Sequence, residues 1–287
     1  NLTVVITSPA KGVIRVQTCH HAGMSAKSPE FELNTGEDNM SATETDELIT
    51  ITSGDLSLEI TKLPWSMTYK HKGMVLSKSG RKDLALMKTD WKGYAYDKGD
   101  YTDTYIRQQL SMGVGELLYG FGERFTPFVK NGQSIDIFNQ DGGTSTEQSY
   151  KNIPFYVSNK GYGVFVNHPE KVSFEVGTEM VTKAEFSVEG SYLDYFFIDG
   201  PSMKDVLVKY TDLTGKPSLP APWTFGLWLS TSFTTNYDEK TVMSFIDGML
   251  DRGIPLRVFH FDCFWMKEFH WSDFVWDERV FPDPEGM

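Results

Sequence analysis

Residues 256–265 read Leu-Arg-Val-Phe-His-Phe-Asp-Cys-Phe-Trp. Residues 256–259 are predicted to form a buried strand, and Asp262 follows at its carboxyl end among aromatic residues. The segment before this strand carries apolar residues at the spacing of one helical face: Val242, Phe245, Ile246, Met249 and Leu250. Ligands of α/β folds bind at the carboxyl ends of the strands, so Asp262 is the first candidate for a ligand-binding residue.

A second strand is expected upstream, at residues 225–229, followed by a loop over 231–237 and a helix that begins at Asp238. Gly253 stands where the C-cap of that helix belongs. Strand, helix and strand make one right-handed βαβ unit, and Asp283 and Pro284 are expected to begin a further helix. A complete (β/α)8 barrel takes roughly 250 residues, so residues 217–287 are expected to be only the start of a truncated one.

The first two hundred residues are predicted to be short strands separated by turns. Strands at 4–6 and 13–16 flank a turn-rich connection, and residues 56–60 alternate apolar and polar side chains. Residues 161–166 and 195–198 have the continuous apolar character of deeply buried strands, whereas the acidic segment 34–47 is expected to be an exposed loop. Many short strands of this kind indicate a β-sandwich.

The character of the chain changes near residue 201. A helix is predicted over 201–210 with Ser202 as its N-cap, and Pro217, Pro220 and Pro222 mark a linker. We therefore divide the chain into an N-terminal β-sandwich domain, residues 1–216, and the start of a barrel, residues 217–287. The chain begins Asn1-Leu2-Thr3-Val4 with a strand under way, so both ends are expected to lie inside a longer protein.

Composition excludes some function classes. The formal net charge is −12, which argues against a nucleic-acid partner, and no apolar run is long enough to span a membrane. The two cysteines, Cys19 and Cys263, have no metal-binding spacing and fit a reducing compartment, so we expect a cytoplasmic location. Aromatic residues make up 14% of the chain, a share that suits either a sugar-binding cleft or a large β-sandwich core.

Each candidate residue has a structural alternative. In the functional interpretation, Asp262 accepts hydrogen bonds from the hydroxyls of a ligand. In the structural alternative, it caps a neighbouring helix or pairs with Arg257 or Lys267. His260 and Asp262 share a strand face and adjoin Cys263, but no third ligand has suitable spacing, so we expect no metal and no cofactor. Cys263 lacks an identifiable base and is expected to be a small apolar wall rather than a nucleophile.

Two further candidates lie in loops. Asp141 belongs to Asp141-Gly142-Gly143-Thr144, which by itself indicates a turn. Phe233 lies in the loop after the first barrel strand, where an aromatic residue ordinarily anchors the loop.

Taken together, these stretches resemble glycoside hydrolase family 31. Residues 120–124 (Gly-Phe-Gly-Glu-Arg), 139–144 (Asn-Gln-Asp-Gly-Gly-Thr) and 151–155 (Lys-Asn-Ile-Pro-Phe) resemble the family's galactose-mutarotase-like N-terminal sandwich. Residues 223–228 resemble its first barrel strand, and 260–265 with 281–284 resemble its second strand and the start of the next helix. Within the family the match is closest to the bacterial α-xylosidases, because α-glucosidases usually carry Asp-Ile-Asp or Asp-Ile-Glu on the second strand.

The resemblance implies roles for five residues. Asp262 would hold sugar hydroxyls in the −1 subsite, and Phe233, Cys263 and Phe264 would form the wall around C5 of that sugar. Asp141 would reach over the barrel mouth toward the substrate. An apolar wall fits xylose, whereas the hydroxymethyl group of glucose would bring a hydroxyl without a partner, at a cost of roughly 1–3 kcal/mol.

The resemblance also implies a retaining, exo-acting enzyme that uses two carboxylates, both on later barrel strands. We therefore expect the full-length protein to be an α-xylosidase acting on terminal α-xylosides such as those of xyloglucan oligosaccharides, and this chain alone to be inactive. The alternatives are an α-glucosidase of the same family and a non-catalytic carbohydrate-binding β-sandwich. The expected partner is the oligosaccharide substrate, and a homo-oligomer of the full-length protein stays open.

Overall fold

The computed structural model describes residues 1–20, 29–36, 39–92, 100–140, 147–231 and 238–287. Its contacts divide the chain into two units, residues 1–216 and 217–287, which are described separately. In the described part of the chain, no helix combines the length and the apolar character needed to cross a bilayer.

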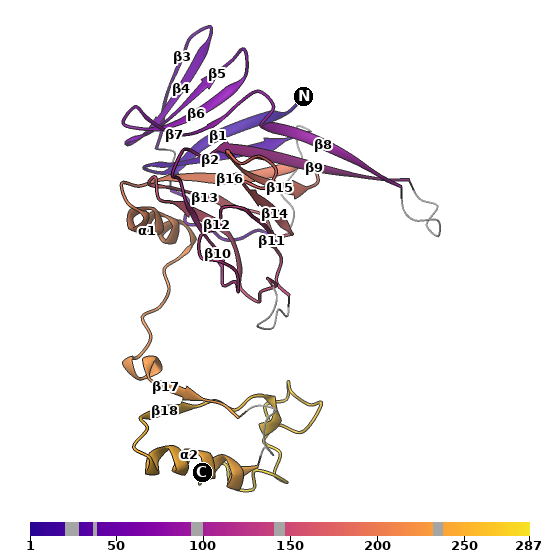
Figure 1. Cartoon of the computed structure of the whole chain (residues 1–287), viewed down its shortest axis with the longest axis vertical. Helices are drawn as coiled ribbons and strands as arrows, with labels where there is room; N and C mark the ends of the chain where they lie inside the picture. Colours follow the sequence, from indigo (N-terminus) through magenta and orange to yellow (C-terminus); the bar gives the residue numbers. More distant parts are fainter. Residues whose placement is uncertain (21–28, 37–38, 93–99, 141–146, 232–237) are drawn as a thin grey trace. The chain divides into compact units, whose positions relative to one another are not determined.

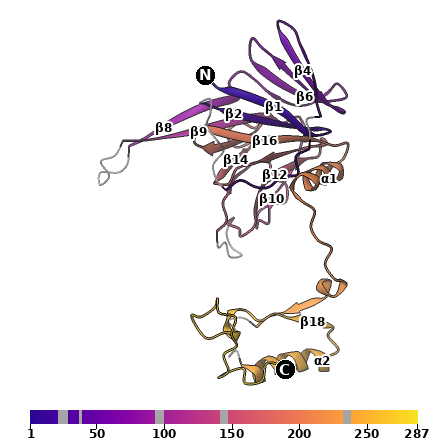
Figure 2. The ribbon, with the colours of Figure 1, turned by 180° about the vertical axis from the view of Figure 1, so that it is seen from behind.

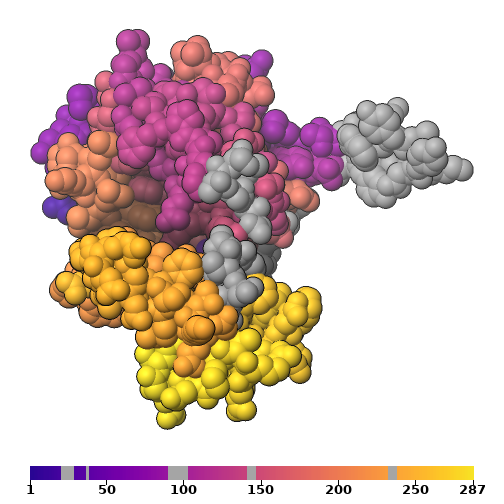
Figure 3. Space-filling view, turned by 60° about the horizontal axis from the view of Figure 1, so that its bottom comes forward, coloured from indigo at the N-terminus to yellow at the C-terminus, as the bar shows by residue number. Residues whose placement is uncertain are grey.

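The first unit is built on two antiparallel sheets that face each other (Figure 1). One sheet has the strand order β1-β2-β16-β13-β12-β10 and the other β11-β14-β15-β9-β8. Their bounds are β1 Thr3–Ala10, β2 Val13–Cys19, β8 Leu84–Lys92, β9 Asp100–Ser111, β10 Leu118–Gly122, β11 Gln133–Ile137, β12 Asn152–Ser158, β13 Tyr162–Val166, β14 Val172–Val176, β15 Lys183–Glu189 and β16 Tyr192–Asp199. The predicted β-sandwich is confirmed, and β8 and β9 extend beyond it as an arm (Figures 1 and 3).

A third antiparallel sheet, in the order β3 to β7, packs beside the sandwich (Figures 1 and 2). Its strands are β3 Ser41–Glu44, β4 Leu48–Ser53, β5 Leu56–Thr61, β6 Ser66–His71 and β7 Met74–Ser79. Tyr69 of β6 joins it to the main core: its ring stacks on Phe197 at 3.9 Å, and its hydroxyl shares a 2.8 Å hydrogen bond with that of Tyr195. All three side chains are fully buried.

The expectation of an exposed loop over 34–47 was wrong in part. Ser41–Glu44 forms the edge strand β3, which pairs with β4 from Ser41 opposite Thr52 to Glu44 opposite Ile49. All four residues of β3 are exposed, so no apolar alternation marks this strand. Backbone pairing with β4, rather than burial of side chains, is what holds it.

Helix α1, Met203–Thr214, covers the outer face of the six-stranded sheet (Figures 1 and 2). Ser202 caps it as predicted: its hydroxyl accepts from the amide of Asp205, and the Asp205 carboxylate accepts from the amide of Ser202, which completes a capping box. Val206 and Leu213 enter a second apolar core on this outer face, together with Phe155, Phe165 and Phe196.

The second unit holds a 3₁₀ turn, Pro222–Phe225, the strands β17 Leu227–Leu229 and β18 Leu256–Phe259, and helix α2 Glu239–Asp251. β17 and β18 pair in parallel, which confirms the predicted βαβ order. The first strand begins two residues later than predicted, because Pro222 starts a helical turn that ends at Phe225. Asp238 caps α2 through the amide of Thr241, and Gly253 follows the helix with a φ of 67°.

Candidate functional site

The candidate site lies at the carboxyl end of β18. The amide of His260 donates to the carbonyl of Leu229 over 2.7 Å, which extends the parallel pairing one residue past β18. The chain then leaves the sheet and forms a short 3₁₀ turn, Cys263–Trp265, with Asp262 as its N-cap. Asp262 therefore occupies the predicted position, directly after a parallel strand.

Asp262 is half-buried, and its Oδ1 accepts a 2.7 Å hydrogen bond from the amide of Cys263. Asp262 is therefore a capping carboxylate, as the structural alternative predicted, and the turn that it caps is the one that follows it directly. Capping uses one lone pair of one oxygen, and an ionised carboxylate has about four such sites. The bond fixes the direction of the carboxylate.

Cys263 is half-buried, and no disulfide involves it. Desolvation raises the pKa of its thiol, and the hydrogen bond to Asp262 and the charge of that carboxylate raise it further. A thiol held protonated in this way is a poor nucleophile, since the thiolate is the reactive form. The role of Cys263 as a small wall stays a prediction.

Phe264 packs edge-on against Trp271, with 5.9 Å between the ring centroids. Behind the turn, Phe261 meets Trp276 and Phe281 in further edge contacts, and Trp265 lies 4.8 Å from Trp276. Phe281 is fully buried. These rings form one aromatic cluster with the Cys263–Trp265 turn, and the sequence interpretation assigned no packing role to Trp271, Trp276 or Phe281. The density of aromatic residues over 264–276 is the signal that could have shown it.

Asp277 connects the segment after Trp276 to the Cys263–Trp265 turn. Its amide donates to the carbonyl of Trp265 over 2.9 Å, and its carboxylate accepts Nε and Nη2 of Arg279 at 2.8 and 2.5 Å. The hydrogen bonds from Arg279 are the largest influence lowering the pKa of Asp277, to about 2. Asp277 is therefore ionised at neutral pH, while its backbone amide is the contact with the turn.

Asp141 and Phe233, the two loop candidates, lie outside the described residues, so the structure does not place them. Both ends of the segment that carries Asp141 are described. Gln140 donates its amide to the carbonyl of Ser149 over 3.0 Å, and the side chain of Gln148 donates to that of Gln140 over 2.7 Å. The two ends thus lie together.

Arg124 organises the base of this segment. Its guanidinium donates to the carbonyls of Glu147 and Asp136 and to Oδ1 of Asn152. Asn152 in turn donates to the carbonyls of Phe138 and Ser149, at 3.0 and 2.7 Å. Burial lowers the pKa of Arg124 without discharging it. The sequence interpretation excluded a phosphate loop at 120–125 but did not find this role for Arg124.

Steric contacts explain why glycine occupies position 122, two residues before Arg124. Gly122 has a φ of 86°, and a Cβ there would lie 2.1 Å from the carbonyl oxygen of Lys151. The pairing of β10 with β12 shifts register between Gly120 and Gly122, which is a β-bulge. Only glycine fits this close approach.

Comparison with known proteins gives the family. Residues 3–175 match the glycosyl hydrolase 31 N-terminal galactose mutarotase-like domain, and residues 217–287 match the glycosyl hydrolases family 31 TIM-barrel domain. This chain belongs to glycoside hydrolase family 31. It is 48% identical to alpha-xylosidase XylQ of Lactiplantibacillus pentosus over 99% of its own length and 36% of that protein. It is 49% identical to an alpha-xylosidase of Emericella nidulans, over 98% of its length and 38% of that protein.

Among solved structures, the chain superposes on the family 31 dextranase of Flavobacterium johnsoniae with a TM-score of 0.84. The two are 21% identical over all of this chain and 34% of the dextranase, so this likeness concerns the fold alone. The chain spans little more than a third of the length of the two α-xylosidases. It is thus the family's N-terminal sandwich together with the first part of its barrel.

Proposed function

We propose that this chain is the N-terminal third of a retaining α-xylosidase and supplies part of the subsite for the terminal xylose. The Asp262-Cys263-Phe264 turn carries the proposal. It stands at the carboxyl end of a parallel strand, where barrel enzymes bind substrate, and presents one carboxylate beside two weakly polar side chains. The identity of 48–49% to two α-xylosidases supports the same substrate class.

In this proposal Asp262 binds and does not react. A carboxylate accepts hydrogen bonds from two sugar hydroxyls, and charge-assisted bonds are stronger than neutral ones. A retaining glycosidase also needs a nucleophile and an acid/base whose carboxyl groups lie about 5–5.5 Å apart. We assign both to barrel strands of the full-length enzyme that follow this chain, so no step of bond cleavage is assigned to Asp262.

Specificity is assigned to the wall. Cys263 and Phe264 have no side-chain group that would strongly hydrogen-bond a hydroxymethyl group at C5. Glucose would bury that hydroxyl without a partner, and such a defect separates related substrates by roughly ten- to a hundredfold. Phe233 is proposed to complete the wall around C5, and Asp141 to reach over the mouth of the barrel toward the substrate, as the family resemblance implies.

The test uses the full-length enzyme with aryl α-xyloside and aryl α-glucoside as substrates. Phe264→Asp places a hydroxyl partner in the wall and is expected to move the ratio of kcat/KM values at least tenfold toward the glucoside. Asp262→Asn keeps the shape and is expected to lower kcat/KM for both substrates by about a hundredfold or more, since it removes the charge.

Phe264→Leu is the matched control, because it changes the same position but adds no hydrogen-bond partner to the wall. It should leave the ratio of kcat/KM values within about threefold of the parent enzyme. A wild-type preference for the glucoside would favour the α-glucosidase alternative. If Phe264→Asp leaves the ratio of kcat/KM values unchanged, Phe264 does not determine the specificity. Turnover of an aryl α-xyloside by residues 1–287 alone would contradict the assignment of the catalytic carboxylates.

We further propose a cytoplasmic location. Cys19 and Cys263 are free thiols that lie in different units, which fits a reducing compartment. The test is fractionation of the source cells. α-Xylosidase activity of this protein outside the cytoplasmic fraction would contradict the proposal.

A further inference from the structure

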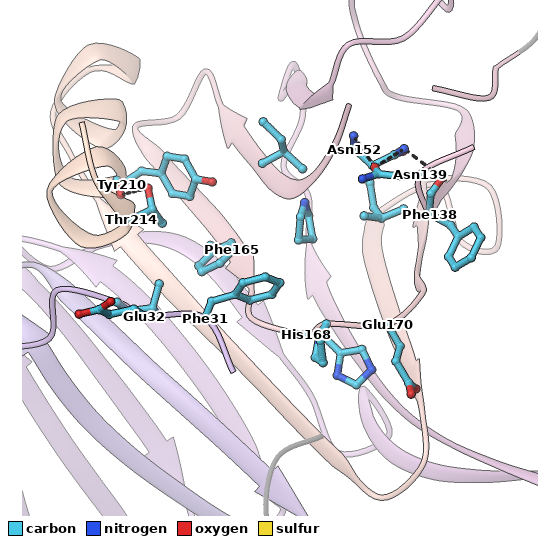
Figure 4. Close-up of a pocket in the computed structure, with 15 residues that line it drawn as sticks. Phe31, Glu32, Phe138, Asn139, Asn152, Phe165, His168, Glu170, Tyr210 and Thr214 are labelled. Atoms are coloured by element: carbon cyan, nitrogen blue, oxygen red, sulfur yellow. Dashed lines mark hydrogen bonds between the residues drawn. The ribbon is translucent and has the colours of Figure 1, made fainter. Parts of the chain in front are cut away.

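We propose that the sandwich carries a second saccharide-binding site, separate from the Asp262 turn, in a pocket beside helix α1 (Figure 4). The pocket has a volume of about 510 Å³. Its lining comes from residues 31–33, the ends of β11, β12 and β13, residues 168–170 and α1. A volume of this size lies within the range of roughly 300–1,000 Å³ that is usual for small-molecule sites.

Hydrogen bonds hold the walls of the pocket in place. On one side, Asn34 fixes the 31–33 segment to α1: its amide donates to the carbonyl of Leu213 over 2.8 Å and its Nδ2 to that of Asp212 over 3.1 Å. On the other side, Nδ2 of Asn152 donates to the carbonyl of Phe138 at 3.0 Å and to Oδ1 of Asn139 at 3.1 Å. A ligand would therefore enter a preformed site and spend little free energy on ordering it.

Aromatic rings line the interior. Tyr210 stacks on Phe155 at 4.0 Å and meets Phe165 edge-on at 5.5 Å, which fixes the floor. Phe31 and Phe138, from opposite walls, each expose 53% of their surface. The C–H face of a pyranose ring is apolar and packs against such rings, while its hydroxyls point to the sides.

The polar lining selects a neutral ligand rich in hydroxyls. Among the residues that the structure describes, the side chains that line the pocket include Glu32, Glu170, Asn139 and Thr214 but no Lys or Arg, which disfavours phosphates and carboxylates. Glu32 lies at the α1 end and Glu170 at the His168 end, so the two carboxylates do not converge on a single cation (Figure 4). Carboxylate, amide and hydroxyl groups spread along an aromatic pocket suit the donors and acceptors of a short oligosaccharide.

The site does not depend on the proposed xylosidase activity, because every described residue that lines it belongs to the first unit. The test is a titration of the 287-residue chain, with methyl-labelled Ile and Leu, by a xyloglucan oligosaccharide. Saturable shifts are expected at the methyl groups of Leu33, Ile137 and Ile153, all of which line the pocket. Phe31→Ala combined with Asn139→Ala is expected to weaken binding at least tenfold.

Two controls separate the alternatives. Phe125→Ala removes a ring that is 64% exposed but does not line the pocket, and it should leave Kd unchanged. Asp262→Asn should also leave Kd unchanged, so loss of the barrel subsite and loss of this site give different results. The proposal is overturned if these methyl groups do not respond, if the double variant binds as the parent does, or if spermidine shifts them and the oligosaccharide does not.

Discussion

The two units of this chain bury their apolar residues to very different extents. In the first unit, one continuous core runs between the sheets from Ile14 to Phe197, and a second fills the space under α1. In the second unit, the fully buried apolar side chains among the described residues are Val242 and Phe281. Trp228 of β17, Phe245 and Leu250 of α2 and Phe274 near the site expose between 37% and 76% of their surface.

This difference follows from the architecture of each unit. An antiparallel sandwich buries its apolar faces against itself and can be complete within 216 residues. A parallel pair of strands needs cover on both faces, and one helix supplies only part of it. The first unit is therefore expected to be stable by itself, whereas the second depends on the remaining strands and helices of a barrel.

Hydrogen exchange on the 287-residue chain gives the largest contrast. The amides of β13 and β16 are expected to exchange only by global unfolding, whereas those of β17, α2 and β18 exchange on the order of a thousandfold faster. The reason is the small buried apolar area of the second unit. Equal protection in the two units would show that residues 217–287 fold without further cover.

Removal of one ring tests the same contrast at single residues. Phe197 is fully buried between the rings of Tyr69 and Tyr162, with centroids 3.9 and 4.8 Å away. Phe197→Ala should lower the free energy of unfolding by about 3–5 kcal/mol, measured by urea denaturation. Phe274→Ala, at a 76% exposed site in the second unit, should change it by less than about 0.5 kcal/mol. Similar losses at both positions would contradict the comparison.

Alkaline pH is expected to lower the free energy of unfolding of the first unit. Burial raises the pKa of Tyr69, Tyr156, Tyr162 and Tyr195, so the folded state holds protons that the unfolded state releases near pH 10. Stability is therefore complete below about pH 10 and decreases as the pH rises above that value. Absorbance at alkaline pH should show these four phenols ionising only together with the loss of sheet structure. Their ionisation before unfolding would show that the core admits solvent.

Helix caps give the smallest effect. Ser202→Ala removes the cap of α1 and should lower the stability of the sandwich by about 1 kcal/mol, while Ser202→Gly should lower it by only a few tenths. Asp238→Ala removes the corresponding cap of α2 and should leave the main thermal transition unmoved. A shift of that transition by Asp238→Ala would mean that the two units unfold together.

Local patterns predicted several elements of this fold, although many strands of the sandwich were not predicted individually. The alternation over residues 56–60, the apolar runs at 161–166 and 195–198, and Ser202 before α1 each correspond to the element expected. Strand β3 was missed because an exposed edge strand of Ser, Ala, Thr and Glu has no side-chain pattern, and its pairing with β4 is non-local. The 3₁₀ turn at 222–225 replaced the start of a predicted strand for a local reason, a proline at its first position.

The candidate site was predictable in part for the same reason. Asp262 was found because its position after a strand is a property of neighbouring residues. Arg124 and the cluster of Trp271, Trp276 and Phe281 were not found, because their contacts join segments that are distant in sequence or separated by irregular turns. The pocket beside α1 was also not predicted, since its walls come from residues 31–33, 137–139 and 210–214.

The class of the two units, the linker between them and the order of carboxylate, thiol and ring after β18 could be predicted from the residues alone, because strand runs, prolines and neighbouring residues are local features. Two other facts come from the folded chain alone: Arg124 holds together residues 136, 147 and 152, and Phe31 and Phe138 face one pocket. These facts depend on where the chain returns in space. Such returns are set by packing of the whole core, which no single stretch of residues encodes.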